Sequence, residues 1–314
     1  MTASTDGRQR GKAPTAPPAG GGFQKPMIDL LHHASVEVSP HAHKAAGLLR
    51  DKFDPGTDVF ISFLPTGDYK EVVKTAAALR HAGFNPVPHV PARSILNLPQ
   101  LDDFLTRLAA EANVTRALLI AGDLDHPAGP FASTMGLLRT DLFAARGIRS
   151  VGFAGHPEGH VSISPRALDL ALTEKLEFAA SSGLSPFLVT QFCFEPDPVI
   201  AWLRNLSRTA PSVPVRIGVA GPATAATLIR FAIRCGIGNS MRAIQSRTNV
   251  IGRLLGETGP QDVLRGISVV LAEMQHSQVS GAHFYPFGGI DKTSNWIAET
   301  LARLYAQITA AGDR

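Results

Sequence analysis

The sequence predicts a (β/α)8 barrel, because short apolar segments alternate regularly with longer amphipathic ones. Eight of the short segments have the β-branched and aromatic content of buried strands. Such alternation implies parallel strands joined by right-handed helical crossovers, and eight units in about 290 residues favour a closed barrel. The predicted strands are Ser35–Ser39, Asp58–Leu64, Asn85–Val90, Arg116–Gly122, Ser150–Gly155, Phe187–Phe194, Val213–Gly221 and Gly281–Phe287.

The segments between the strands have helical periodicity and recognisable ends. Pro165 and Pro260 stand at first helical positions, and Gly83, Gly147 and Gly183 stand where a glycine commonly ends a helix. A doubly wound open sheet is the alternative, although no Gly-x-Gly-x-x-Gly follows the first strand. The predicted helices are His43–Phe53, Tyr69–Ala82, Leu98–Ala112, Ala132–Arg146, Pro165–Ser181, Pro198–Thr209, Ala223–Cys235, Ser240–Leu255, Pro260–Gln275 and Lys292–Ala311.

Residues 1–25 are rich in Gly, Pro, Ala, Thr and Ser, so we expect a disordered tail before a single catalytic barrel at 26–314. The tail carries a net charge of +3 out of +4 for the whole chain, which argues against a basic nucleic-acid-binding face on the barrel. The sequence shows no membrane-spanning run, no signal-peptide core and no disulfide framework. We therefore expect a cytoplasmic protein with a small-molecule partner and no nucleic-acid or membrane partner. A homo-oligomer stays open.

Polar side chains stand at the carboxyl ends of most predicted strands, where (β/α)8 barrels carry their active sites. Gln191, for example, interrupts an apolar run, and a buried amide without partners costs about 1–3 kcal/mol. Each residue alone has a structural explanation, such as backbone partners or turn capping, but ionisable groups gathered at one mouth are costly unless used. The set is Glu37, Ser62, His89, Asp123, His156, Glu158, His160, Gln191, His283 and Tyr285.

Other chemistries fit these residues less well. His156 and His160 are four apart, but the proline and glycine between them predict a loop rather than a helical metal-binding face, and we expect no metal site. No nucleophile elbow or phosphate-binding P-loop occurs. Glu37 and Asp123 are a conceivable glycosidase pair, but both tryptophans fall on predicted helices rather than at a sugar site.

Six motifs, in the same order along about Ser35 to Tyr285, resemble those of methylenetetrahydrofolate reductases. Their counterparts in that family read Phe-Glu-Phe-Phe-Pro, Pro-His, Arg-Gly-Asp, Tyr-Pro-Glu-x-His-Pro, Ile-Thr-Gln-Phe-Phe-Phe and His-Phe-Tyr. The matching segments here are Ser35-Val-Glu-Val-Ser-Pro40, Val87-Pro-His89, Ile120-Ala-Gly-Asp123, His156-Pro-Glu-Gly-His160, Val189-Thr-Gln-Phe-Cys-Phe194 and His283-Phe-Tyr285.

The resemblance implies a barrel that binds FAD at its mouth and reduces 5,10-methylenetetrahydrofolate to 5-methyltetrahydrofolate with NADH or NADPH. Glu37 would be the general acid that opens the substrate's imidazolidine ring, which needs a raised pKa. Asp123 would stabilise the resulting 5-iminium cation, while Gln191 and Tyr285 would bind the substrate. The residues implied for the flavin site are Ser62, His89, Ile120, Ala121, Gly122, Asp123, His156, His160, Asp169 and Lys175.

Four departures from the family pattern concern the handling of cofactor and substrate rings. Ala121 replaces an arginine, His156 a tyrosine and Ala225 a phenylalanine, and Pro286-Phe-Gly-Gly289 replaces Thr-Leu-Asn-Arg. Direct hydride transfer without flavin is therefore an alternative. So are a tetrahydrofolate-dependent methyltransferase and a non-catalytic folate-binding protein on the same barrel. The sequence distinguishes neither NADH from NADPH nor methionine synthesis from demethylation-linked one-carbon metabolism.

Overall fold

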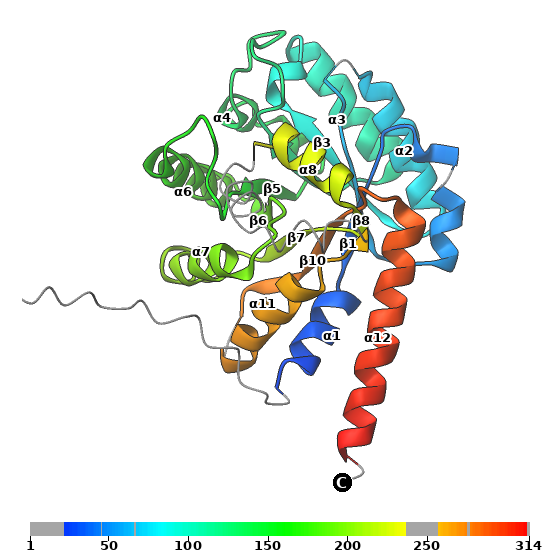
Figure 1. Ribbon diagram of the computed structural model, residues 1–314. Helices are drawn as coiled ribbons and strands as arrows, with labels where there is room; N and C mark the ends of the chain where they lie inside the picture. The colour runs from blue at the N-terminus through cyan, green and yellow to red at the C-terminus, as the bar shows by residue number, and fades with distance from the viewer. Residues whose placement is uncertain (1–21, 45, 66, 237–256, 275–276, 313–314) are drawn as a thin grey trace, which may run out of the picture.

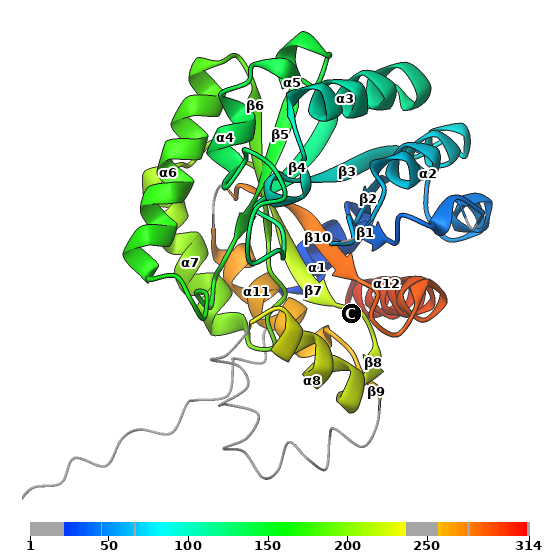
Figure 2. The ribbon, with the colours of Figure 1, turned by 90° about the horizontal axis from the view of Figure 1, so that it is seen from above.

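A computed structural model describes residues 22–44, 46–65, 67–236, 257–274 and 277–312. Eight parallel strands close into a barrel in the order β1-β10-β7-β6-β5-β4-β3-β2, with helices around them (Figures 1 and 2). The closed order confirms the predicted (β/α)8 barrel and excludes the open sheet. The strands are β1 (Ser35–Val38), β2 (Asp58–Ile61), β3 (Asn85–Pro91), β4 (Arg116–Ile120), β5 (Ser150–Gly155), β6 (Ser185–Thr190), β7 (Val215–Ala220) and β10 (Val279–Tyr285).

The helices largely follow the predicted segments, and none of those in the described part of the chain is long and apolar enough to cross a membrane. A small antiparallel pair, β8 (Ala223–Thr224) with β9 (Glu257–Thr258), was not predicted. The helices are α1 (Gln24–His32), α2 (Tyr69–His81), α3 (Leu98–Ala112), α4 (Thr134–Leu138), α5 (Leu142–Ala145), α6 (Pro165–Ser181), α7 (Pro196–Thr209), α8 (Ala225–Arg234), α11 (Gln261–Glu273) and α12 (Ile290–Gly312).

Three predictions about helices need correction. The sequence reading missed α1, which begins two residues inside the expected tail and buries Met27, Ile28, Leu30 and Leu31. The helix predicted over His43–Phe53 is instead a pair of 3-10 segments, Ala42–Lys44 and Ala46–Asp51. The helix predicted over Ala132–Arg146 is split into α4 and α5, because Asp141 between them has a positive φ of 57°. The predicted helix Ser240–Leu255 and residues 1–21 lie outside the described residues.

Several strands end earlier than predicted, and this moves polar residues into the loops at the mouth. Ser62 follows β2 directly and Gln191 follows β6 directly, while Gly122 and Asp123 follow β4. Gly122 turns the chain with φ = 91°, and a Cβ built there would lie 3.0 Å from the Pro91 Cβ. The positive φ and the close approach of Pro91 therefore both favour a glycine just before Asp123.

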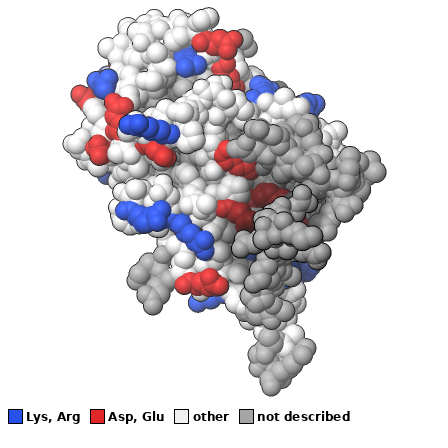
Figure 3. All heavy atoms as spheres, turned by 60° about the vertical axis from the view of Figure 1, so that its left-hand side comes forward, with Lys and Arg blue, Asp and Glu red and all other residues white. Residues whose placement is uncertain are grey.

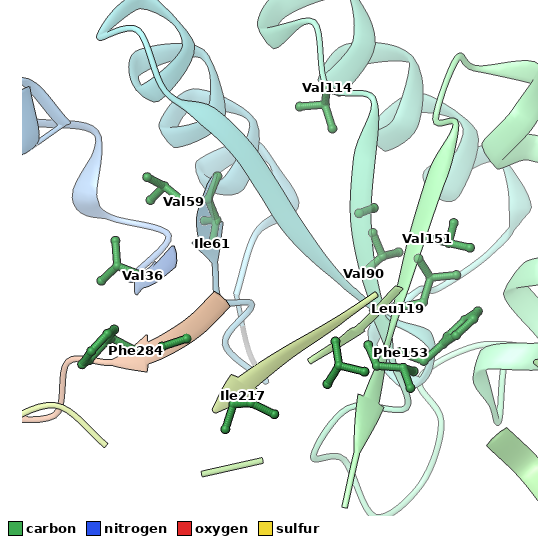
Figure 4. Close-up of a cluster of buried hydrophobic side chains, with 14 of the residues drawn as sticks. Val36, Val59, Ile61, Val90, Val114, Leu119, Val151, Phe153, Ile217 and Phe284 are labelled. Carbon is green, nitrogen blue, oxygen red and sulfur yellow. The ribbon is translucent and has the colours of Figure 1, made fainter. Parts of the chain in front are cut away.

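Two layers of apolar side chains form the core, as expected when successive strand residues point to opposite sides. Val59 and Ile61 of β2 belong to the large cluster that includes the helices (Figure 4). Phe60, between them, belongs to a separate buried cluster with Val87, Leu118, Phe187 and Val189. This second cluster fills the barrel interior beneath the mouth.

A buried ion-pair network joins the amino ends of three strands. Asp58, 6% exposed, accepts hydrogen bonds through Oδ2 from Arg116 and, at 2.8 Å, from Arg216. Arg216 also donates to the carbonyl oxygen of His33, 2.6 Å away, and the Arg116 guanidinium lies 4.6 Å from the centre of the Phe187 ring. The network ties β2, β4 and β7 to the end of α1.

Asp58→Asn should lower the free energy of unfolding by about 3 kcal/mol, because it leaves two partly buried guanidinium groups without their carboxylate. The control is Asp102→Asn, which breaks the pair between Arg146 and Asp102, whose side chains are 39% and 37% exposed. That variant should lose about 1 kcal/mol or less. Urea unfolding of both variants measures the difference. Equal losses of unfolding free energy in the two variants would contradict a larger contribution from the buried network.

Candidate active site

The centre of the mouth holds a glutamate between two histidines. The Glu37 side chain on β1 is 20% exposed, and its Oε2 lies 3.6 Å from Nε2 of His89 on β3. The same oxygen lies 3.8 Å from Nε2 of His283 on β10, whose side chain is fully buried. Both Nε2 atoms are buried and have no hydrogen-bond partner within the part of the chain that the structure describes. The structure therefore brings together three residues that are far apart in the sequence.

Burial controls the protonation of this cluster. Loss of solvation raises the pKa of Glu37 above that of an ordinary glutamate, and the nearby His89 offsets this only in part. Burial lowers the pKa of His89, and burial together with the charge of Arg216 lowers the pKa of His283 to about 3. The two imidazoles are therefore neutral near neutral pH, and the carboxyl group keeps its proton to higher pH than usual.

Tyr285 connects this cluster to β6, two strands further around the barrel. Its hydroxyl donates a hydrogen bond to the carbonyl oxygen of Thr190 at the end of β6, 3.1 Å away. Its ring centre lies 4.8 Å from that of His283 and 5.6 Å from that of Phe192. Burial, with a contribution from Glu37, raises the pKa of Tyr285 well above its usual value. The hydroxyl proton is thus committed to the backbone, and substrate binding by Tyr285 stays a prediction.

Gln191 is half-buried directly after β6, and the backbone satisfies part of its amide. Its Oε1 accepts a hydrogen bond from the backbone N–H of Phe192, 3.1 Å away. Its own backbone N–H donates to the carbonyl oxygen of Gly155, 2.8 Å away. Hydrogen bonding to the backbone therefore accounts for the side-chain oxygen of Gln191. Hydrogen bonding of the amide to a pterin stays a prediction.

Asp123 is exposed on a loop that Arg93 fixes in place. The Arg93 guanidinium donates to the carbonyl oxygens of Leu124, at 3.1 Å, and Ala132, at 3.2 Å. Main-chain hydrogen bonds join Arg93 to Ala121 and Ala128 on the same loop. Sequence reasoning missed this clamp, because nothing in the local pattern distinguishes Arg93 from a surface arginine.

Cys235, at the carboxyl end of α8, is a second residue that the sequence did not point to. Burial raises the pKa of its thiol to about 11, and the charges of Asp123 and Glu37 contribute to that rise. Cys235 is therefore within electrostatic reach of both carboxylates. Its apolar sequence surroundings gave no sign of this position. In Figure 1, α8 lies higher than β7 and β10, and α1 lies below them.

Three of the residues implied for a flavin site lie together beside the mouth. The rings of His156 and His160 meet edge to face with centroids 5.8 Å apart. Burial, with smaller effects of His160 and Lys175, lowers the pKa of His156 to about 4. The Lys175 amino group lies 6.0 Å from the centre of the Phe153 ring, and burial lowers its pKa. Two imidazoles that can donate hydrogen bonds therefore lie near a partly buried amino group. Such a set of groups suits an anionic ligand.

The other residues implied for the flavin site are more dispersed. The Ser62 hydroxyl donates to the carbonyl oxygen of Val38, 3.1 Å away, and Asp169 is exposed on α6. His89 faces Glu37, while Ile120, Ala121 and Gly122 form the end of β4 and the turn after it. On the face carrying α4 and α6, acidic and basic side chains are interspersed (Figure 3). Among the described residues, no three His, Cys, Asp or Glu side chains are placed to share a metal ion.

Comparisons with known proteins identify no family and no activity for this chain. No protein-family model matches this chain. Dihydropteroate synthase from Thermus thermophilus is 14% identical, with 87% of this chain and 91% of that chain covered and a TM-score of 0.46. 3-Dehydroquinate dehydratase from Geobacillus kaustophilus is 11% identical, with 87% and 91% covered and a TM-score of 0.45. Similarities this weak carry no argument about activity, which has to come from the site itself.

Glu37→Gln should make the protein more stable than the wild type as pH rises. The wild-type carboxyl has a raised pKa when folded, so its stabilising contribution is complete below the unfolded pKa and is lost as pH rises through the folded pKa. The uncharged amide avoids that loss. Urea midpoints at about pH 4 and about pH 8 measure the trend, with Glu111→Gln on exposed α3 as the control. A difference that stays constant with pH would contradict a raised Glu37 pKa.

Proposed function

We propose that this protein reduces 5,10-methylenetetrahydrofolate to 5-methyltetrahydrofolate, with NADH or NADPH as reductant. The observation that carries the proposal is the Glu37 carboxyl, which has a raised pKa and lies between His89 and His283 on a side chain that is 20% exposed. Asp123 is exposed on a loop at the same mouth. The reaction needs an acid that is still protonated near neutral pH and a separate carboxylate that stays charged. Burial raises the pKa of Glu37 and so favours its protonated form, and Asp123 is an exposed carboxylate.

Glu37 and Asp123 have separate roles in the proposed reaction. Glu37 donates its proton to the amine nitrogen of the substrate's five-membered ring, and the carbon–nitrogen bond to that nitrogen breaks. The positive charge then resides on the 5-iminium group, where the Asp123 carboxylate stabilises it. A hydride added to the iminium carbon completes the methyl group. One hydride and one proton are consumed, and Glu37 regains its proton before the next cycle.

An aromatic cluster beside Tyr285 offers a surface for the planar rings of substrate and reductant. Phe231 of α8 and Phe287 after β10 are stacked, with centroids 4.0 Å apart and planes inclined by 14°. Tyr285 and Phe287 are also nearly parallel, at 15° and 5.9 Å. The family's phenylalanine near the start of α8 is replaced by buried Ala225. We propose that Phe231 and Phe287 supply the aromatic surface in its place.

His156, His160 and Lys175 are proposed to bind a dinucleotide pyrophosphate. The His160 Nδ1 lies 3.1 Å from the backbone N–H of Ser162 and accepts its hydrogen bond, so in a neutral ring Nε2 carries the proton and can donate. FAD, when bound, would take the hydride from the nicotinamide and deliver it to the substrate. FAD and NADH both carry a pyrophosphate, so the same residues also suit direct transfer from NADH.

Glu37→Gln should lower kcat for NADH oxidation with methylenetetrahydrofolate by about 100-fold or more, because the amide cannot donate the ring-opening proton. Glu111→Gln should retain wild-type activity. A visible spectrum of the pure wild-type protein shows whether a flavin band is present and whether the substrate re-oxidises it. A colourless wild-type protein with full activity would favour direct transfer. A wild type that binds tetrahydrofolate without oxidising NADH would favour methyl transfer or binding alone.

Lys175→Met should weaken dinucleotide binding by about tenfold, since it removes the cation of the pyrophosphate cluster. If the protein binds FAD, the variant should purify with less flavin. If the protein is colourless, the variant should show a higher KM for NADH with kcat little changed. The control is Lys74→Met on α2, whose side chain is 58% exposed. Unchanged flavin content and unchanged KM together would contradict the assignment.

A further inference from the structure

Ser35 and His283 form a hydrogen-bonded pair directly beneath Glu37. They are register partners across the junction of β1 and β10, and both side chains are fully buried. The Ser35 Oγ lies 2.9 Å from Nδ1 of His283 and 3.4 Å from the carbonyl oxygen of Ala282. The His283 ring is also packed edge-on against Phe60, with centroids 4.5 Å apart. The imidazole therefore has a fixed orientation, with Nδ1 toward the serine and Nε2 toward Glu37.

The hydrogen bonds of Ser35 determine which nitrogen of His283 carries the proton. A hydroxyl has one proton to donate, and the carbonyl oxygen of Ala282 can only accept. Both contacts are satisfied together only if Ser35 donates to Ala282 and accepts from Nδ1–H of His283. A neutral imidazole has a single N–H, so Nε2 is then a bare acceptor. That acceptor faces the Glu37 Oε2, 3.8 Å away.

We propose that Ser35 and His283 are positioning residues that present an unprotonated Nε2 to Glu37 and thereby hold the catalytic proton on its carboxyl group. His283 gives up no proton itself. The separation of 3.8 Å is longer than a hydrogen bond, so direct contact requires a small rotation of the Glu37 carboxyl toward Nε2. The inference depends on the proposed function only in calling Glu37 the acid.

Other charged and titratable groups around the pair do not replace this role. Above it, the carboxyl faces His89, and its charge reaches Tyr285 and Cys235, whose thiol also feels the charge of Asp123. Below it, Arg216 lowers and Asp58 raises the pKa of His283, and burial outweighs both. None of these groups touches Nδ1 of His283, whose partner is the Ser35 hydroxyl. Replacing Ser35 therefore removes the hydrogen bond that keeps the proton on Nδ1 of His283.

The test is Ser35→Ala, which deletes one oxygen atom in the core. Without the hydroxyl, the Nε2–H tautomer becomes accessible, and its N–H favours an ionised Glu37. Carbon-13 NMR of glutamate-labelled protein follows the Glu37 carboxyl, assigned by its absence in Glu37→Gln. We expect its titration midpoint to fall by about one pH unit, equivalent to about tenfold in the acid fraction above the midpoint. Ser280→Ala on β10, the strand that carries His283, should leave the midpoint unchanged, because the Ser280 hydroxyl donates to the carbonyl oxygen of Val215.

The kinetic counterpart is a shift in the pH profile. In Ser35→Ala, kcat should fall about tenfold near neutral pH and recover at lower pH, with KM unchanged. His283→Phe, which keeps a ring but no nitrogen, should also lower the NMR midpoint. A midpoint that stays or rises in both variants, or a kcat reduced equally at every pH, would overturn the proposal. If the wild type has no reductase activity and Ser35→Ala still lowers the NMR midpoint, the proposed function would be overturned. The inferred role of Ser35 and His283 would then remain.

Discussion

The pairing of β1 with β10 closes the barrel, and the candidate site depends on that closure. Only two residue pairs define the register, Ser35 with His283 and Val36 with Phe284. They join segments 248 residues apart in the chain. The carboxyl of Glu37 meets the ring of His283 solely because this seam is in register. A slip of one residue would turn Glu37 out of the barrel and leave Ser35 facing the helices.

The barrel interior sets the chemistry of the mouth through solvation. The ring of Phe60 packs edge to face against His283, and the apolar layer around Phe60 keeps water away from the cluster. Burial then acts in opposite directions on acids and bases, raising the pKa of Glu37 and lowering that of His283. Asp123, exposed on its loop, lies outside this apolar layer. One barrel end therefore provides both an acid with a raised pKa and an exposed carboxylate.

The sequence predicted the architecture well, because apolar strands and amphipathic helices are local patterns. It placed Glu37, His89 and Tyr285 at the mouth, because parallel strands end on one side. It missed α1, since a nine-residue helix next to a Gly- and Pro-rich stretch gives a weak signal. It also missed Arg93, Cys235 and the partnership of Ser35 with His283. Those roles arise from contacts between distant segments, and no local pattern encodes them.

The two ends of the barrel are coupled through His283. At the amino end, Asp58 pairs with Arg116 and Arg216, and the charge of Arg216 contributes to lowering the His283 pKa while Asp58 opposes it. At the imidazole, Asp58 opposes the effect of Arg216, and burial remains the main cause of the lowered pKa. An imidazole that stayed neutral but lost its fixed tautomer would no longer favour the protonated acid. The ion-pair network of Asp58, Arg116 and Arg216 therefore supports the site by stabilising the barrel. The Ser35 hydroxyl determines which nitrogen of His283 carries the proton.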